Sequence, residues 1–210
     1  MTRSRQRPSS RSDVPFPRTI GPWQVQSRRV AFENPWIQIV DHAVQHPDGS
    51  DGQYGVVRFK NRAIGILPVH EDGTIPLVGQ HRFAHDSYSW ELPEGGGPLD
   101  QDPLDAAKRE LAEETGLRAA HWMEIAQFDV SNSVTDEQAV CFLAWDLTKG
   151  APSPDPSEKF TYDRVSFSAL RKRVFNGQIR DSLTIIMVLK AAALLEAGEL
   201  PPEVAKRLGG

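Results

Sequence analysis

Long hydrophobic runs and a surplus of basic charge are both missing from this sequence of 210 residues. No run approaches the roughly 18 apolar residues that a membrane-spanning helix needs. The net charge of -4 argues against a surface that holds duplex nucleic acid by neutralising its phosphates. We therefore expect neither a membrane nor a nucleic acid among the partners of this protein.

Cysteine is nearly absent as well. A single cysteine, Cys141, excludes an intramolecular disulfide and a site built from several thiolates. This usage suits a reducing compartment, and we expect a cytoplasmic protein. Cys141 lies in the apolar run AVCFLAWDL, so we interpret it as a buried core thiol and not as a nucleophile.

Apolar residues are also scarce in residues 1–19, which are rich in Arg, Ser and Pro. Such a segment cannot bury enough surface to offset the entropy of ordering, so we expect a disordered tail. An organellar transit peptide is the alternative, which the prolines disfavour because they interrupt an amphipathic helix. Residues 20–60 then alternate apolar and polar residues between the turn signals ENP and PDGSDG, which predicts an antiparallel β meander.

Residues 61–197 combine short β-like runs with helical patterns, which predicts an α/β domain with a mixed sheet and helices on the outside. Helices are expected over residues 168–177 and 181–198, the second with Asp181 as its N-cap. We expect residues 198–210 to form a C-terminal tail.

The stretch DPLDAAKRELAEETG is typical of a helix over residues 103–115. Asp102 can cap the free amides, Pro103 suits the first helical position and Gly116 suits the end. Asp102 and Asp105 precede three further carboxylates in this stretch.

Three glutamates gather on one side of this helix. At about 100° per residue, Glu110, Glu113 and Glu114 fall within roughly a 100° arc. Like charges at this spacing destabilise an isolated helix by a few tenths of a kcal/mol. A solvated charged face is one interpretation. The other is a divalent cation among the carboxylates, and hard oxygen donors suit Mg²⁺ or Mn²⁺.

Residues 95–117 resemble the Nudix box, G-x5-E-x7-R-E-U-x-E-E-x-G-U, in which U is a bulky aliphatic residue. The matching residues are Gly95, Arg109, Glu110, Leu111, Glu113, Glu114, Gly116 and Leu117. Gln101 departs from the pattern, since it stands where the box has its first Glu. In the family that Glu lies outside the helix, so the change bears on efficiency or metal count more than on the fold. The resemblance implies a Nudix α/β/α sandwich with a mixed sheet, preceded by a small antiparallel β meander.

Other segments are similar to the Nudix branch that acts on ADP-ribose and nucleoside-diphosphate sugars. WELPEGG resembles the ELPAG segment of that branch, VGQHRF resembles VRQYR, and SNSVTDE stands where its loop SPGFTDE follows the box. The meander of residues 20–60 looks like the extra β domain with which these enzymes dimerise. Members of this branch release a nucleoside monophosphate and a phosphorylated second product, so the resemblance implies a nucleotide-sugar substrate and a homodimer.

The resemblance also implies roles for the charged residues of the box. Glu110 and Glu114 would hold the metal ions, with Glu113 bridging or assisting. Arg109 would pair with a carboxylate and fix its orientation. The backbone carbonyl of Glu94 would add a metal ligand.

A general base is expected, by the same resemblance, from a loop after the box. The matching loop APSPDPSEKF has Glu158 as its one glutamate, with Asp155 as a neighbour. Glu137 in SVTDE is the competitor, and the sequence favours Glu158 slightly. Lys159 follows where many relatives have a second acid.

Four further residues are candidates for substrate binding. Arg82 and Arg58 are possible diphosphate clamps because Arg matches phosphate oxygens bidentately. Trp36 offers a face to a nucleobase across a dimer interface, and Glu91 belongs to the ELPEGG segment. The alternatives are exposed strand arginines and an aromatic residue that only packs.

The leading hypothesis is a Mg²⁺-dependent (or Mn²⁺-dependent) hydrolase of ADP-ribose or a related nucleotide sugar. ADP-ribose-specific relatives often carry a proline in the loop after the box, and SNSVTDE has none, so sugars attached to ADP, GDP or UDP are all open. The alternatives are a hydrolase of modified nucleoside triphosphates and a nucleotide-binding regulator without turnover.

Overall fold

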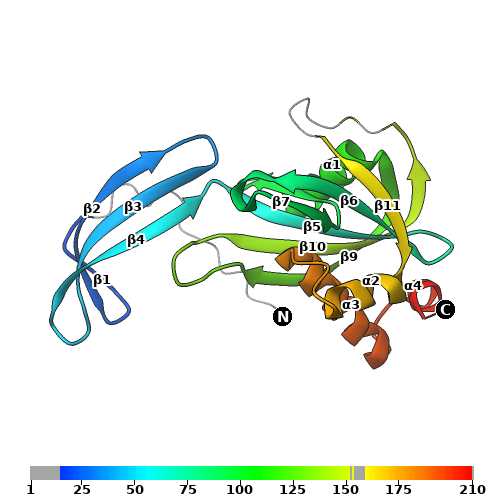
Figure 1. Ribbon diagram of the computed structural model, residues 1–210. Coiled ribbons are helices and arrows are strands. Elements are labelled where there is room, and N and C mark those ends of the chain that lie inside the picture. The colour runs from blue at the N-terminus through cyan, green and yellow to red at the C-terminus, as the bar shows by residue number, and fades with distance from the viewer. Residues whose placement is uncertain (1–14, 152, 154–158, 210) are drawn as a thin grey trace. The chain divides into compact units, whose positions relative to one another are not determined.

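Two compact units make up the chain, residues 1–58 and 59–210. The computed structural model describes residues 15–151, 153 and 159–209 (Figure 1). Most of the tail expected over residues 1–19 lies outside the described residues, and residues 18 and 19 belong to the first strand. The expected boundary after residue 60 lies close to the observed division.

The N-terminal unit is an antiparallel meander, as the alternation of apolar and polar residues predicts. Its strands follow one another in the sheet in chain order: β1 (Arg18–Ile20), β2 (Trp23–Glu33), β3 (Ile37–Gln45) and β4 (Asp51–Phe59). Val25, Val40 and Val44 are buried, whereas most of β2 is exposed. This sheet therefore has one covered and one largely open side.

The C-terminal unit has a central mixed sheet with the strand order β8-β5-β10-β9. Its strands are β5 (Asn61–Val69), β8 (Glu94–Pro98), β9 (Leu117–Asp129) and β10 (Gln138–Lys149). The pairing of β5 with β10 is parallel and the outer pairings are antiparallel. A second, antiparallel sheet has the order β11-β6-β7, from β6 (Thr74–Arg82), β7 (Ser87–Glu91) and β11 (Thr161–Ser166). A 3-10 turn, η2 (Phe83–His85), joins β6 to β7.

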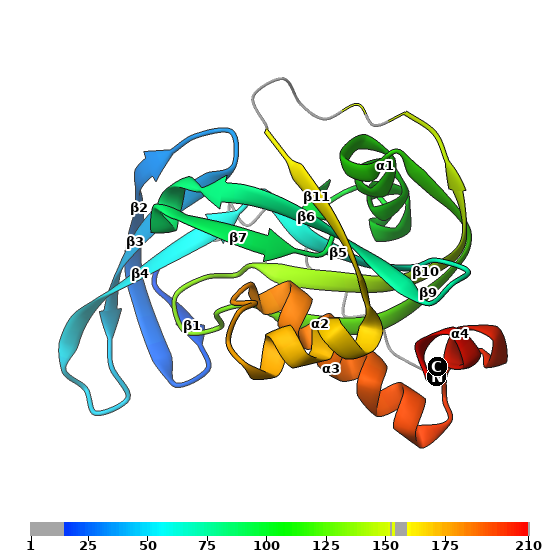
Figure 2. The ribbon, with the colours of Figure 1, turned by 45° about the vertical axis from the view of Figure 1, so that its right-hand side comes forward.

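Side chains of β5 and β10 point alternately to two cores, one on each face of the central sheet. Ile64, Ile66, Val140 and Phe142 pack with helix α1 (Pro103–Thr115) on one face. On the other face, residues such as Leu67 pack with α2 (Phe167–Phe175), α3 (Ser182–Ala197) and the second sheet. Figure 2 shows α1 and the pair α2 and α3 on opposite sides of the strands. The predicted α/β sandwich with a mixed sheet is confirmed.

Helix α1 begins and ends where the sequence predicts. The Asp102 carboxylate accepts a hydrogen bond from the Leu104 amide at 2.8 Å, and Pro103 occupies the first turn. Gly116 ends the helix with a φ of 70°, a left-handed conformation that favours glycine. Asp181 likewise caps α3 by accepting from the Thr184 amide at 2.6 Å.

Residues 198–210 differ from the expected tail. They contain a further helix, α4 (Pro202–Leu208), and its Val204 and Leu208 are buried in the core that includes α3. Seven residues make too short a pattern to stand out in the sequence, but two buried side chains tie the helix to the domain. This segment is part of the C-terminal unit.

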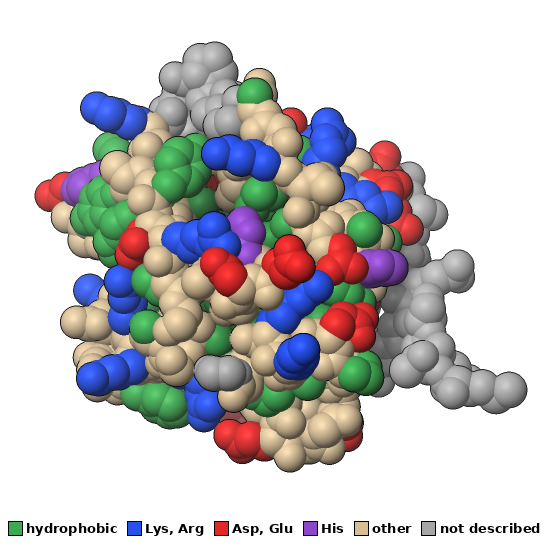
Figure 3. Space-filling model, turned by 90° about the vertical axis from the view of Figure 1, so that its right-hand side faces the viewer, with side chains coloured by type: hydrophobic (Ala, Val, Ile, Leu, Met, Phe, Trp, Pro, Cys, Tyr) green, Lys and Arg blue, Asp and Glu red, His purple; other side chains and the backbone are tan. Residues whose placement is uncertain are grey.

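No helix in the described part of the chain is both long and apolar enough to cross a membrane. On the face of the molecule drawn in Figure 3, acidic and basic side chains are interspersed with polar and apolar ones. That face therefore carries no broad patch of a single charge sign.

Candidate functional site

Strand β8 lets helix α1 approach closely because it is built mainly from glycine. A Cβ atom at Gly95 would lie 2.1 Å from the carboxyl carbon of Glu110, closer than any real contact. The missing side chain of Gly95 therefore makes room for the Glu110 carboxylate directly against the strand.

Arg109 holds two of the predicted metal ligands in place. Its guanidinium lies 2.8 Å from a carboxylate oxygen of Glu110 and 2.8 Å from one of Glu113. The same group donates to the carbonyl oxygen of Gly96 at 2.8 Å. Burial raises the pKa of Glu110, and the charge of Arg109 opposes that rise. Arg109 thus pairs with two carboxylates of α1, and the orienting role that the sequence suggests for it stays a prediction.

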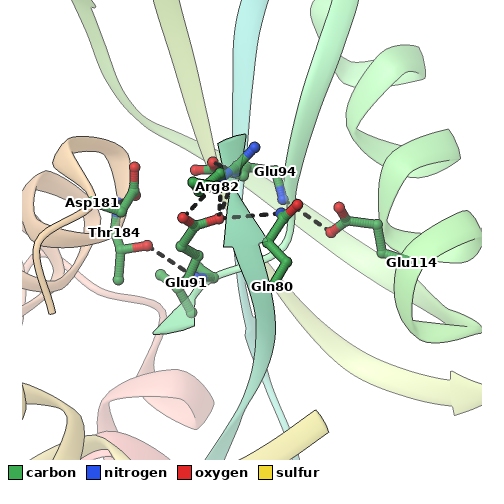
Figure 4. A network of polar contacts seen from close by, with 8 residues as sticks. Gln80, Arg82, Glu91, Glu94, Glu114, Asp181 and Thr184 are labelled. Atoms are coloured by element: carbon green, nitrogen blue, oxygen red, sulfur yellow. Dashed lines mark hydrogen bonds and ion pairs between the residues drawn. The ribbon is translucent and has the colours of Figure 1, made fainter. Parts of the chain in front are cut away.

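Glu114 is buried, and its carboxylate turns toward strand β8. One of its oxygens accepts a hydrogen bond from the backbone N–H of Glu94 at 3.1 Å (Figure 4). Glu110 and Glu114 are thus the buried glutamates of α1. The Glu113 side chain is 42% exposed, and its described partner is Arg109.

Arg82, on β6, contacts one glutamate of β7 and one of β8. Its Nε contacts both carboxylate oxygens of Glu91 at 3.0 and 3.1 Å, and its Nη2 donates to Glu91 and to Glu94. Gln80, two residues earlier on the same face of β6, also donates to Glu91 at 3.3 Å. The Glu91 side chain is 3% exposed, so its carboxylate is buried and holds the guanidinium of Arg82 in place.

A third carboxylate joins this group from the far end of the chain. Oxygen atoms of Glu91, Glu94 and Asp181 all lie within 4.8 Å of one another. Asp181 precedes α3, and Thr184 of that helix accepts a hydrogen bond from the Leu92 amide at 2.9 Å. In Figure 4, Asp181 and Thr184 lie on one side of Arg82 and Glu94, and Glu114 of α1 lies on the other.

The crowding of carboxylates changes the acidity of Glu94. Burial raises its pKa well above the ordinary value, and the negative charges of Asp181 and Glu91 raise it further, while Arg82 opposes them. In addition, the Oε2 atom of Glu94 is buried with no hydrogen-bond partner. The site therefore holds more negative charge than its arginines balance.

The remaining predicted residues are not gathered here by the described contacts. Arg58 and Trp36 belong to the N-terminal unit, and their part in a site of the C-terminal unit stays a prediction. Glu158 lies outside the described residues. Glu137 lies between β9 and β10, where burial raises its pKa and the charge of Asp136 adds to that rise.

Asp181, Gln80 and Thr184 are site residues that sequence reasoning missed. The sequence predicts Asp181 as a helix cap, and the structure confirms that local role. Its distance in sequence from Glu91 hides the proximity of the two carboxylates. The alternation of β6 places Gln80 on the same face as Arg82, and this signal was available in the sequence.

The comparison with protein families identifies the C-terminal unit. Residues 59–183 match the family described as NUDIX domain. The chain belongs to the NUDIX family. Residues 23–57 match a second family, the nucleoside diphosphate sugar hydrolase N-terminal domain. Residues 95–117, which resemble the Nudix box, lie within this match and include most of β8 and all of α1.

Similar proteins include an ADP-ribose pyrophosphatase from Mycobacterium tuberculosis, which is 33% identical over 137 residues. This match covers 63% of the present chain and 65% of the relative, just under two thirds of its length. An ADP-ribose pyrophosphatase from Bacillus subtilis is 30% identical over 131 residues, 62% of this chain and 67% of that one.

A solved structure of an ADP compounds hydrolase has the same fold. It superposes with a TM-score of 0.76, covers 87% of this chain and 100% of its own, and is 15% identical. The fold of the present chain is therefore shared with this structure.

Proposed function

We propose that this Nudix protein is a hydrolase that cleaves the diphosphate linkage of ADP-ribose or another nucleoside-diphosphate sugar. The products are a nucleoside monophosphate and a sugar phosphate. The reaction depends on a divalent cation, Mg²⁺ or Mn²⁺, held by carboxylates of α1 and β8.

One observation carries the metal assignment. The Oε2 atom of Glu94 is buried without a hydrogen-bond partner, beside a group of carboxylates that outnumber the arginines. A buried unpartnered carboxylate oxygen is costly unless a cation or a proton binds it. Oxygen donors of this kind are the ligands that Mg²⁺ and Mn²⁺ prefer. Glu94 shares the acidic group with Glu91 and Asp181. By the resemblance to the Nudix box, Glu110 and Glu114 of α1 would hold the ion together with Glu94, with Glu113 assisting.

Such an ion, when bound, neutralises phosphate oxygens and lowers the pKa of a coordinated water. The protein itself supplies orientation. Arg109 keeps the Glu110 carboxylate against β8, and the Glu94 amide fixes one oxygen of Glu114. These contacts hold the ligands before substrate arrives, so little reorganisation is needed during the reaction.

Arg82 is suited to bind the diphosphate. Its Nε and Nη2 are held by Glu91 and Glu94, whereas its Nη1 meets no protein acceptor among the described residues. Its side chain is 38% exposed, so Nη1 can donate to a phosphate oxygen. Glu91 thereby acts on the substrate through Arg82.

The proton of the attacking water requires a base, and two glutamates remain candidates. Burial and the neighbouring Asp136 raise the pKa of Glu137, which makes it a stronger base than an ordinary glutamate. Glu158 is supported by the resemblance of its loop to that of the ADP-ribose hydrolases. Comparing the pH profiles of Glu137→Gln and Glu158→Gln separates them, because loss of the base removes the acidic limb of the profile.

The substrate class is supported by the relatives and by the N-terminal unit. Two relatives bear the name ADP-ribose pyrophosphatase, and residues 23–57 match a domain named for nucleoside-diphosphate-sugar hydrolases. A hydrolase of modified nucleoside triphosphates would leave this N-terminal domain without a role. A nucleotide-binding regulator without turnover would leave the organised carboxylates of α1 without a role.

We also propose that the N-terminal unit forms a homodimer. Val30, Phe32 and Trp36 are each more than half exposed, on or beside the largely open strand β2. Exposed apolar groups of this kind mark surfaces that bind a partner. Light scattering of the wild type and of Phe32→Lys tests this, since a charge in the interface converts a dimer to a monomer.

The deciding experiment is hydrolysis of a panel with Mg²⁺ or Mn²⁺. The panel contains ADP-ribose, ADP-glucose, GDP-mannose, UDP-glucose, diadenosine polyphosphate and 8-oxo-dGTP. We expect turnover of a diphosphate sugar and a loss of about 100-fold or more in Glu114→Gln, as for removal of a key charge-stabilising group. Glu199→Gln, an exposed glutamate after α3, is the matched control and keeps full activity.

The other outcomes separate the alternatives. Turnover of 8-oxo-dGTP alone would favour the triphosphate hydrolase. Tight nucleotide binding without any turnover would refute the enzyme and indicate a regulator, in which Gln101 replaces a residue needed for catalysis.

A further inference from the structure

The last turn of helix α1 receives an unusual donor. The hydroxyl of Tyr162 donates a hydrogen bond to the backbone carbonyl oxygen of Glu114 at 2.7 Å. Tyr162 lies on β11, 48 residues further along the chain. A side chain from a distant strand therefore contacts the backbone of a residue whose carboxylate belongs to the acidic site.

The final carbonyl groups of a helix have no partner within the helix and must find one elsewhere. At the end of α1, the Ala112 carbonyl accepts from the Gly116 amide at 3.0 Å, and the Glu113 carbonyl accepts from the Ser153 amide at 2.9 Å. The Tyr162 hydroxyl supplies a donor for the next carbonyl, that of Glu114. Removal of the hydroxyl takes this hydrogen bond away from the Glu114 carbonyl.

Tyr162 also connects the β11-β6-β7 sheet with helix α1, and both carry residues of the acidic site. Through β11 it pairs with Val78 of β6, the strand that carries Gln80 and Arg82. Its hydroxyl therefore ties the β11-β6-β7 sheet to α1. Glu114 is held at both ends, because its carboxylate accepts from the Glu94 amide of β8 at 3.1 Å.

The hydroxyl keeps its proton at neutral pH. Partial burial raises the pKa of Tyr162 above its ordinary value of 10.0, and the negative charge of Glu114 raises it further. It therefore stays a donor over the pH range in which a hydrolase of this kind is assayed.

We propose that Tyr162 is a positioning residue that sets where Glu114 stands relative to Arg82 and Glu94, and so sets the affinity of the site for a divalent cation. This inference rests on the proposed metal-dependent function. Tyr162 does not contact the reacting atoms in this role, since it acts through the backbone of Glu114.

The test compares Tyr162→Phe with Tyr88→Phe. Tyr88 is a well-matched control, because it is 50% exposed against 53% for Tyr162. Its hydroxyl bonds to that of Thr161 within the same sheet and does not reach α1. Each variant loses one tyrosine hydroxyl, so we expect each to lower the Tm by about 2–4 °C.

Mn²⁺ binding is measured directly from the decrease in the EPR signal of the free ion. This measurement separates a positioning role of Tyr162 from an effect on protein stability. We expect Tyr162→Phe to bind Mn²⁺ about fivefold more weakly, which is a net hydrogen bond of ~1 kcal/mol converted at 1.4 kcal/mol per tenfold. Tyr88→Phe should bind Mn²⁺ as the wild type does. In turnover assays, Tyr162→Phe should need more Mg²⁺ for half-maximal rate, with an unchanged KM for substrate at saturating metal.

Equal Mn²⁺ affinity of Tyr162→Phe and the wild type overturns the inference, and so does an equal weakening in Tyr88→Phe. A wild type that binds Mn²⁺ but hydrolyses nothing in the panel refutes the proposed function alone, and the Mn²⁺ comparison still decides the role of Tyr162. A wild type that binds no Mn²⁺ overturns both.

Discussion

Replacing Gly95 with alanine is the most direct structural test of the contact between β8 and α1. The new Cβ would lie 2.1 Å from the carboxyl carbon of Glu110, against 3.4 Å for the shortest ordinary contact. The carboxylate must therefore retreat by about 1.3 Å, the difference between these distances. Because Arg109 binds the same carboxylate, its alignment with Gly96 is disturbed as well.

The expected effect follows from that displacement. A misplacement of about 1 Å in a catalytic group costs on the order of 100-fold in rate, so we expect kcat/KM of Gly95→Ala to fall by that factor. Overpacking costs about 1–3 kcal/mol of stability, which lowers the Tm by several degrees but leaves the protein folded at 25 °C.

The assay measures kcat/KM with the best substrate of the panel, together with Mn²⁺ affinity and Tm. Gly55→Ala is the control, because a Cβ at Gly55 meets nothing within 4 Å. Wild-type activity and Mn²⁺ affinity in Gly95→Ala would refute the argument that Glu110 must lie against β8.

The other predictions concern buried ionisable groups. In the presence of a chelator, we expect the stability of the protein to fall as pH rises above 4.5, because the folded chain keeps the Glu94 proton that the unfolded chain releases. Glu94→Gln should flatten this slope in thermal melts, and an unchanged slope would contradict the origin assigned to it. Burial raises the pKa of Cys141 to about 12, so a thiol reagent at pH 8 should label the protein only after denaturant is added. Rapid labelling of the folded protein would show that this thiol is accessible.

Much of the fold could be predicted because its signals are local. The caps Asp102 and Asp181, the helix end at Gly116 and the alternating strands all depend on residues that are neighbours in the sequence, and the structure confirms them. Helix α4 was missed because seven residues give too little periodicity, and its burial depends on a core made by distant segments.

The residues of the candidate site could likewise be predicted where their signal is local and not where it depends on distant segments. Glu110, Glu114 and Arg109 lie on one helix, where a regular spacing reveals their common face. Glu94 was expected to contribute its carbonyl group, whereas the described contacts involve its amide and its carboxylate. The approach of Asp181 to Glu91 could not be inferred, because nothing local indicates which strand the start of α3 will meet.

The position of α3 has a consequence for how the protein is made. Asp181 and Thr184 close the acidic site, although they follow every strand of the C-terminal unit in the chain. A chain still being synthesised can form its meander and its sheets early, since folding proceeds from the N-terminus during translation. Its carboxylates meet Asp181 and Thr184 only after α3 has left the ribosome, so the nascent protein cannot assemble the complete site before that helix has been synthesised.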